Sequence, residues 1–471
     1  MSSSPQVPGL RRALGLRDIV LFFVTTGTNL QWVAIAAAAG PSSLTVWAIG
    51  ILVMFLPLAA CVVELSSRHP DEGGLYVWST RAFGPFAGFL TGWTYWCSNL
   101  PYFPGVLYFA AGNALYIHGG LEGLSASSTY FIGFSLFGLA LATLVNVVGL
   151  EVGKWLNNMG AISRWAATLG LIGLGITATL TLGAATPITP ASLVPGLSLK
   201  DLVFFSAIAF ALTGPEAASF MGDEVQDARR TIPRGLLIAA PMIAGIYVLG
   251  TLSVMAALPA AEVTGLQGVM QAVDRAGTRL GIEWVAPLGA ALLTLTALGS
   301  VGAWLEAVAR IPFVAGLDKH LPAAFGRVHP RWGTPVNALL TQASLTVVFV
   351  VMGQAGTSVR GAYEVLVSMT FLVTLIPFLF VFSAAIKLSF EPPGPDGWRV
   401  PGGRPVLIAL ASIGLLTTLA SIVLSAIPAA DEPNKPLAML KVVGGTLLLV
   451  AAGVVTYAAG HRNSATSATR P

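Results

Sequence analysis

Residues 202–221, LVFFSAIAFALTGPEAASFM, form an apolar run about as long as one membrane-crossing helix requires. Leu212-Thr213-Gly214-Pro215-Glu216 interrupts this run near its middle. Pro215 has no backbone N–H to donate and crowds the preceding turn, whereas Gly214 relaxes the backbone. Non-helical backbone at this depth is tolerated only where it lines a cavity or is buried in protein. The stretch therefore predicts a broken membrane helix beside an internal cavity.

A second interruption lies near the amino end, where Thr25-Thr26-Gly27-Thr28-Asn29 divides the apolar run 18–39. Half-helix N-termini attract a carboxylate and exposed carbonyl groups attract an ammonium, so two breaks together suit a zwitterion. Breaks in the first and sixth spans also fit an inverted repeat of five plus five helices. The alternative is a simple kink at Gly214-Pro215, with the threonine hydroxyls bonded back to their own helix.

The composition requires lipid as the solvent. Of the 471 residues, 55% are hydrophobic and 10% are charged, whereas soluble domains carry about 25% charged residues. The net charge of +4 does not indicate nucleic-acid binding, because the basic residues lie in short loops. Cys61 and Cys97 both lie in apolar runs, which excludes a disulfide framework.

The chain predicts an all-α membrane protein with twelve transmembrane helices. The expected spans are 18–39, 43–65, 86–112, 128–149, 158–183, 202–221, 236–258, 284–308, 336–353, 363–386, 405–428 and 438–459. Most of the 25 Lys and Arg residues fall in segments on the same side of the membrane as the amino terminus. Because basic loops favour the cytoplasmic side, we expect both termini in the cytoplasm and the protein in the cell (inner) membrane.

Five parts follow from this division of the chain. They are a cytoplasmic tail at 1–17, a first repeat at 18–183, a second repeat at 202–386, spans 11 and 12 at 405–459, and a cytoplasmic tail at 460–471. Two loops have helical character: residues 71–78 predict a short interfacial helix, and residues 262–283 predict an amphipathic helix on the outer surface.

No residue set predicts catalysis, a metal site or a cofactor. The five histidines do not pair at metal-ligand spacing, and Ser, His and Asp form no recognisable triad. Two charges nevertheless lie deep in the apolar runs, Glu216 beside the second break and Arg164 inside the fifth span. Intramembrane charges are functional candidates by default. Glu216 can exchange a proton or bond a freed backbone amide, whereas Arg164 can act only as a fixed cation.

Several stretches, taken in order, resemble the amino acid/polyamine/organocation permease superfamily over nearly the whole chain. They are Glu72 to Trp78, Ala82-Phe83-Gly84 to Gly88-Phe89, Gly214-Pro215-Glu216, Gly222 to Val225 and Arg229 to Arg234. Two further stretches are most similar to the glutamate:γ-aminobutyrate antiporter branch: Gly302-Ala303-Trp304 through Leu321 to Phe325, and Val400 to Gly403.

The resemblance implies the LeuT-like fold, in which spans 1 and 6 are broken around a central site. It implies that backbone amides at Thr26, Gly27 and Thr28 hold the substrate carboxylate, with Asn29 and Gly214 beside them. It further implies that the carbonyl groups of Phe210, Ala211 and Leu212 bind the amino group of the substrate. Phe210 would also be the aromatic gate, and Trp304 would be an aromatic residue near the inner side of the site. Glu216 matches a proposed proton sensor, and Arg164 matches a position where sodium-independent members carry a lysine.

Two departures from the family pattern bear on the substrate. Thr26-Gly27-Thr28 stands where many members have Gly-Ser-Gly, and Arg164 removes a titratable group. Glutamate is therefore not carried over as substrate, and an apolar pocket of Phe103, Phe210, Leu212 and Trp304 suggests a neutral amino acid.

We expect a secondary active transporter of amino acids, independent of sodium, working by proton symport or by exchange. Its partners are a small amino acid, protons in the symport mode and the lipid bilayer. The alternatives are an amine or polyamine carrier, a non-transporting sensor on the same scaffold, and a channel, for which rings of charge at a constriction are missing.

Overall fold

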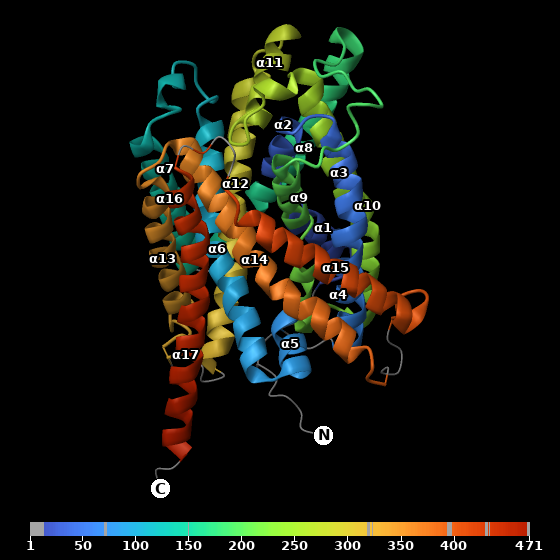
Figure 1. Cartoon of the computed structure of the whole chain (residues 1–471). Helices are drawn as coiled ribbons and strands as arrows, with labels where there is room; N and C mark the ends of the chain where they lie inside the picture. Colours follow the sequence, from blue (N-terminus) through green and yellow to red (C-terminus); the bar gives the residue numbers. More distant parts are fainter. Residues whose placement is uncertain are drawn as a thin grey trace.

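The computed structural model describes residues 14–69, 73–148, 150–317, 321–322, 324–392, 398–428, 432 and 434–468. Within these ranges the chain is helical, and its sole β contact is an isolated bridge between Leu14 and Val225. Figure 1 shows the helices gathered in one bundle.

The elements follow the chain in order. They are α1 Leu16–Gly27, α2 Leu30–Ala38, α3 Ser42–Gly50, η1 Ile51–Phe55, α4 Leu56–Arg68, α5 Leu75–Phe83, α6 Pro85–Ala114, η2 Glu122–Leu124, α7 Ser128–Val148, α8 Leu150–Leu182, α9 Leu199–Ala211, η3 Pro215–Glu224, α10 Ala228–Ala257, η4 Ala260–Glu262, α11 Gly268–Arg279, α12 Val285–Leu317, α13 Val336–Gln354, α14 Val359–Leu388, α15 Gly403–Ser425, α16 Lys435–Met439, η5 Leu440–Gly444 and α17 Gly445–Ala468.

The described helices account for the twelve predicted spans. Ten are long and apolar enough to cross a membrane, and α1 with α2, bent by 41°, forms an eleventh. The remaining predicted span, 86–112, lies within α6, which is not among these eleven but whose 30 residues give a length of about 45 Å at 1.5 Å per residue. Its Trp, Tyr, Asn and Pro residues make it less apolar than the other spans, because it faces the interior of the bundle.

Several helices extend past the predicted boundaries. α8 begins at Leu150 and α10 at Ala228, each eight residues before the predicted span, and α17 continues to Ala468 in the predicted carboxy-terminal tail. A helix satisfies its own backbone hydrogen bonds in water as well as in lipid, so it can continue beyond the membrane. The change from apolar to polar residues in the sequence therefore marks the edge of the hydrocarbon layer and not the end of the helix.

The two loop helices are both present. α5 begins directly after Gly73 and Gly74 of the predicted interfacial segment, while Asp71 and Glu72 lie outside the described residues. α11 buries Val269, Met270 and Val273 on one face, which confirms the amphipathic pattern.

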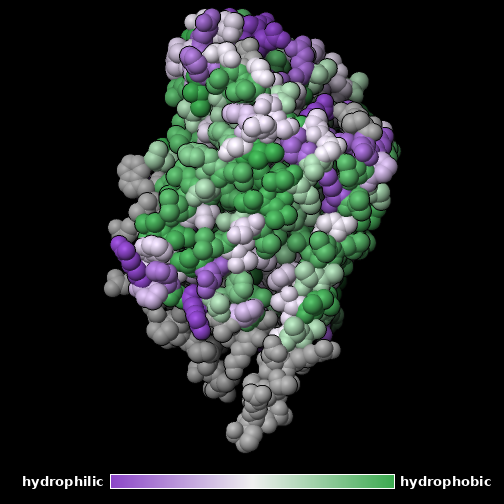
Figure 2. Space-filling model, turned by 90° about the vertical axis from the view of Figure 1, so that its left-hand side faces the viewer, coloured by the Kyte–Doolittle hydropathy of each residue, from purple (hydrophilic) through white to green (hydrophobic). Residues whose placement is uncertain are grey.

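The outer surface of the bundle is apolar, as a lipid-facing surface must be. Figure 2 shows hydrophobic residues over the middle of one face and hydrophilic residues gathered toward its upper end. On α8 the large side chains of Ile162, Leu169 and Leu180 are exposed. Exposed apolar area on this scale marks a membrane protein rather than a soluble one.

The two broken spans touch each other at two glycines. Gly214 has φ +128°, a conformation that side chains rarely allow, and a Cβ there would lie 3.0 Å from Gly27 Cα. A Cβ on Gly27 would in turn lie 2.8 Å from Ile243 Cδ1 of α10. Glycine is therefore required at Gly214, by both its φ angle and its backbone contact, whereas at Gly27 the new atom would meet only the flexible end of Ile243.

We expect Gly214→Ala to destabilise the protein by about 1–3 kcal/mol, because the new methyl group meets backbone and the φ angle is unfavourable. Thermal unfolding of the purified protein in detergent measures this loss. Gly245→Ala in α10 is the control, since a Cβ there meets nothing within 4 Å. Equal unfolding temperatures for the two variants would contradict the packing argument.

Candidate functional site

A cavity lies where the two breaks meet. Its volume is about 70 Å³, well above the roughly 10–15 Å³ that one water molecule needs. The lining residues come from seven spans: Thr25, Thr26, Thr28, Asn29, Trp32, Tyr95, Ser98, Asn99, Tyr102, Arg164, Phe210, Ala211, Thr213, Gly214, Glu216, Tyr247, Trp304, Thr370 and Thr374.

The break in span 1 consists of two extended residues between α1 and α2. Thr28 has φ −130° and ψ 135°, and Asn29 has φ −146° and ψ 126°. Asn29 caps α2, since its Oδ1 accepts a hydrogen bond of 3.1 Å from the backbone N–H of Gln31. The hydroxyls of Thr26 and Thr28 donate back to Phe22 and Val24, as the alternative in the sequence analysis expected.

Arg164 of α8 binds the carbonyl groups that this break exposes. One guanidinium nitrogen donates to the carbonyl oxygens of Thr25 and of Thr28, the latter at 2.9 Å. The other terminal nitrogen donates to the hydroxyl of Ser300 on α12. A cation at the carboxy end of α1 also opposes the helix dipole there. The guanidinium therefore joins α1, α8 and α12 at one point.

The break in span 6 separates α9 from η3. Glu216, which is 2% exposed, folds back so that its Oε2 accepts a 2.7 Å hydrogen bond from the N–H of Gly214. Its Oε1 accepts a 3.2 Å hydrogen bond from the hydroxyl of Tyr95 on α6. Bonding to a freed backbone amide was one of the two roles that the sequence left open for this carboxyl group.

Tyr247 of α10 links the two breaks, and the sequence analysis missed it. Its hydroxyl donates to the carbonyl oxygen of Ala211 at 3.0 Å and accepts from the N–H of Asn29 at 3.3 Å. Its ring stacks on Trp47 with centroids 4.4 Å apart, and Trp47 Nε1 donates to Thr251 at 3.1 Å. A lone tyrosine in the apolar run 236–258 was the available signal.

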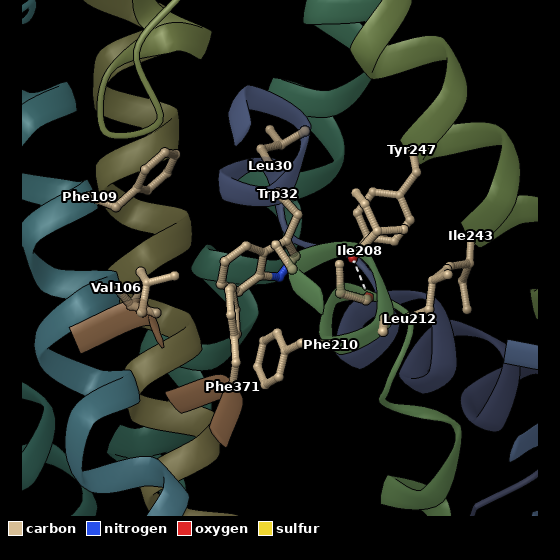
Figure 3. Packing of buried hydrophobic residues seen from close by; sticks show 14 of the residues in the cluster. Leu30, Trp32, Val106, Phe109, Ile208, Phe210, Leu212, Ile243, Tyr247 and Phe371 are labelled. Carbon is tan, nitrogen blue, oxygen red and sulfur yellow. Dashed lines mark hydrogen bonds between the residues drawn. The ribbon is translucent and has the colours of Figure 1, made fainter. Parts of the chain in front are cut away.

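Two aromatic rings of the cavity wall, Trp32 and Phe210, pack against a third, Phe371. Phe210 lies 5.2 Å from Trp32 and 4.7 Å from Phe371 of α14, measured between ring centroids. Figure 3 shows these three side chains converging, with Tyr247 approaching from α10. Trp32 and Phe371 were not among the predicted site residues, because their place depends on how α2 and α14 pack.

Most of the predicted site residues line the cavity. They are Thr26, Thr28, Asn29, Arg164, Phe210, Ala211, Gly214, Glu216 and Trp304. Gly27 and Leu212 lie outside the lining: Gly27 packs against Gly214 and Ile243, and the Leu212 side chain points to Gly50 of α3. Phe103 is fully buried and also lies outside the lining, so the wall is more polar than expected.

Comparison with known proteins agrees with this geometry. A family model described as amino acid permease matches residues 16–449. A probable agmatine/putrescine antiporter of Lactococcus lactis is 26% identical, with 88% of each chain covered. A glutamate/gamma-aminobutyrate antiporter of the same species is 22% identical over 81% of this chain and 77% of its own.

Among solved structures, MhsT in complex with L-phenylalanine matches with a TM-score of 0.58 and 16% sequence identity. The match covers 88% of this chain and 100% of that chain. At this identity the likeness concerns the fold alone, and it confirms the LeuT-like arrangement of broken helices that the sequence predicted.

We expect Tyr247→Phe to lower the free energy of unfolding by about 1–3 kcal/mol, because it removes the partner of one buried and one partly buried backbone group and keeps the ring stack. Thermal unfolding in detergent measures the change. Tyr130→Phe is the matched control, since the Tyr130 hydroxyl also donates to a single carbonyl group, that of Ala111 at 2.9 Å. A loss no greater than that of the control would contradict the bridging role.

Proposed function

The chain belongs to the amino acid permease family, and on that premise we propose that it carries amino acids across the cell (inner) membrane as a sodium-independent secondary transporter. Both termini face the cytoplasm in this proposal, because most of the basic residues lie on that side. Residues 18–183 and 202–386 act as the two inverted repeats, and a rocking bundle of helices gives the cavity alternating access to the two sides of the membrane.

The observation that carries the proposal is the guanidinium of Arg164 at the break of span 1. It engages the carbonyl oxygens of Thr25 and Thr28 and the hydroxyl of Ser300. Carbonyl and hydroxyl oxygens are also the ligands that a hard metal cation prefers. Because the arginine fills this oxygen cluster with a permanent charge, transport has no need of a sodium ion there.

Glu216 is the candidate for proton coupling. It is a buried carboxyl group in the cavity wall, it touches the break of span 6 through Gly214, and it reaches α6 through Tyr95. Its protonation would weaken both contacts at once, so a proton could favour one packing of the break over another. Exchange of one amino acid for another is the alternative mode, and it needs no titrating group.

An amine or polyamine carrier remains the second candidate, supported by the resemblance to the probable agmatine/putrescine antiporter. A dication is less well suited to this cavity, because the described lining contains one carboxylate and one guanidinium and so has no excess of negative charge. Uptake of labelled amino acids and of labelled putrescine into proteoliposomes separates the two. Saturable uptake of putrescine alone would replace the amino-acid proposal.

We expect uptake at equal rates when sodium is replaced by choline. Arg164→Ala should reduce uptake about tenfold or more, because it leaves the carbonyl groups of Thr25 and Thr28 without their donor. Arg279→Ala, on the outer helix α11, is the control and should transport normally. A sodium requirement in the native protein would refute the role of Arg164.

We expect Glu216→Gln to flatten the dependence of uptake on pH while the protein stays folded. The glutamine side chain still offers an oxygen to the Gly214 N–H, so the local turn is kept. Initial rates in proteoliposomes over a range of external pH provide the measurement, with Glu364→Gln outside the cavity as control. A variant profile parallel to that of the native protein would exclude proton coupling through Glu216.

A further inference from the structure

Seven of the ten hydroxyl groups on the cavity wall share one property, the direction of their hydrogen bonds. Each of the following donates its only proton to an acceptor of the protein itself: Thr26 to Phe22 O at 2.9 Å, Thr28 to Val24 O at 2.6 Å, Tyr95 to Glu216 Oε1 at 3.2 Å, Ser98 to Tyr95 O at 2.7 Å, Thr213 to Phe210 O at 2.8 Å, Tyr247 to Ala211 O at 3.0 Å, and Thr370 to Leu366 O at 2.7 Å. A hydroxyl has one proton and two lone pairs, so these groups offer acceptors to a ligand.

This orientation follows from the membrane setting. A hydroxyl in a helix at low dielectric has a carbonyl group of the preceding turn within reach, and an unbonded proton there is costly. The Asn99 amide likewise donates to Tyr95 O at 3.0 Å. Trp32 and Trp304 bring indole N–H donors, so donors are present in the lining, but hydroxyl oxygens outnumber them.

The two charges in the described lining are also engaged. Arg164 donates to Thr25, Thr28 and Ser300, while Glu216 accepts from Gly214 and Tyr95. With one charge of each sign, the described wall has no surplus cation for a second carboxylate on a substrate. A side-chain carboxylate would therefore meet mainly lone pairs, which repel it.

Ser98 and Thr370 are the acceptors best placed to meet a substrate side chain. In the proposed function the main-chain groups of the substrate bind at the breaks, which belong to spans 1 and 6. Ser98 lies on α6 and Thr370 on α14, two helices that pack against each other and contribute a different part of the wall. Both side chains are buried yet border the cavity.

We propose that this site selects small amino acids whose side chain brings a hydrogen-bond donor, such as serine and threonine, and rejects a side-chain carboxylate. The proposal rests on the proposed function and names its substrate class. The cavity volume of about 70 Å³ favours a small side chain. The apolar pocket expected from the sequence would instead favour isosteric apolar side chains.

Competition in proteoliposomes tests the proposal with the native protein. Unlabelled L-serine and L-2-aminobutyrate, and likewise L-threonine and L-valine, compete with labelled L-serine. Each pair differs by a hydroxyl in place of a methyl group, so size is held constant. We expect the hydroxylated member to compete about threefold to tenfold better, as one additional hydrogen bond provides, and L-glutamate to compete weakly.

A matched pair of variants places the effect at the wall. Thr370→Val removes the acceptor oxygen and should bring the serine to 2-aminobutyrate ratio toward one. Thr446→Val is the control, because the Thr446 hydroxyl makes the same bond to the carbonyl oxygen four residues earlier, Val442 O at 2.7 Å, and lies outside the lining. A ratio that stays unchanged in Thr370→Val excludes Thr370 as the selecting group.

The outcomes separate this proposal from the proposed function. Saturable amino-acid uptake in which the methyl members or glutamate compete as well as serine overturns the selectivity and leaves the transporter intact. Absence of uptake for every amino acid, with the protein folded, overturns the proposed function itself. Better competition by both hydroxylated members supports the two proposals together.

Discussion

The central constraint on this protein is that backbone groups freed in the middle of a membrane must find partners inside the protein. Spans 1 and 6 both lose their helical hydrogen bonds there, where water and lipid head groups are out of reach. Side chains meet several of the exposed groups at these breaks: Arg164 at Thr25 and Thr28, Tyr247 at Asn29 and Ala211, and Glu216 at Gly214.

This constraint also explains why the two charges in the described cavity wall are tolerated. An isolated charge at this depth is costly, but a guanidinium at a helix carboxy end and a carboxylate on a backbone amide both oppose local dipoles. Arg164 and Glu216 therefore stabilise the breaks while they line the cavity. A structural role and a transport role are compatible, because changing either charge changes the packing of a broken helix.

The two breaks are mechanically connected rather than independent. The backbones of Gly27 and Gly214 lie against each other. The Tyr247 hydroxyl bonds both Asn29 and Ala211, which are 218 and 36 residues away from Tyr247 along the chain. Since α10 carries Tyr247, motion of this helix reaches both breaks. The aromatic group of Trp32, Phe210 and Phe371 adds contacts between α2, α9 and α14 over the same cavity.

The sequence by itself determined the solvent, the class of fold and the places of the breaks. Composition required lipid, apolar run lengths set the spans, and Gly214-Pro215 with Gly27 located the breaks, because these are local properties of the chain. It also identified Glu216 and Arg164, since a charge in an apolar run is conspicuous without any structure.

Only the tertiary structure decided which side chains meet. The partners Tyr95, Tyr247 and Ser300 lie on other helices, and a helix sequence specifies a face without specifying which neighbour covers it. For the same reason Leu212 and Phe103, apolar and adjacent to the site in sequence terms, turned out to pack away from the cavity. The polar character of the wall arose from helix packing, which brings hydroxyl groups from five spans to one cavity.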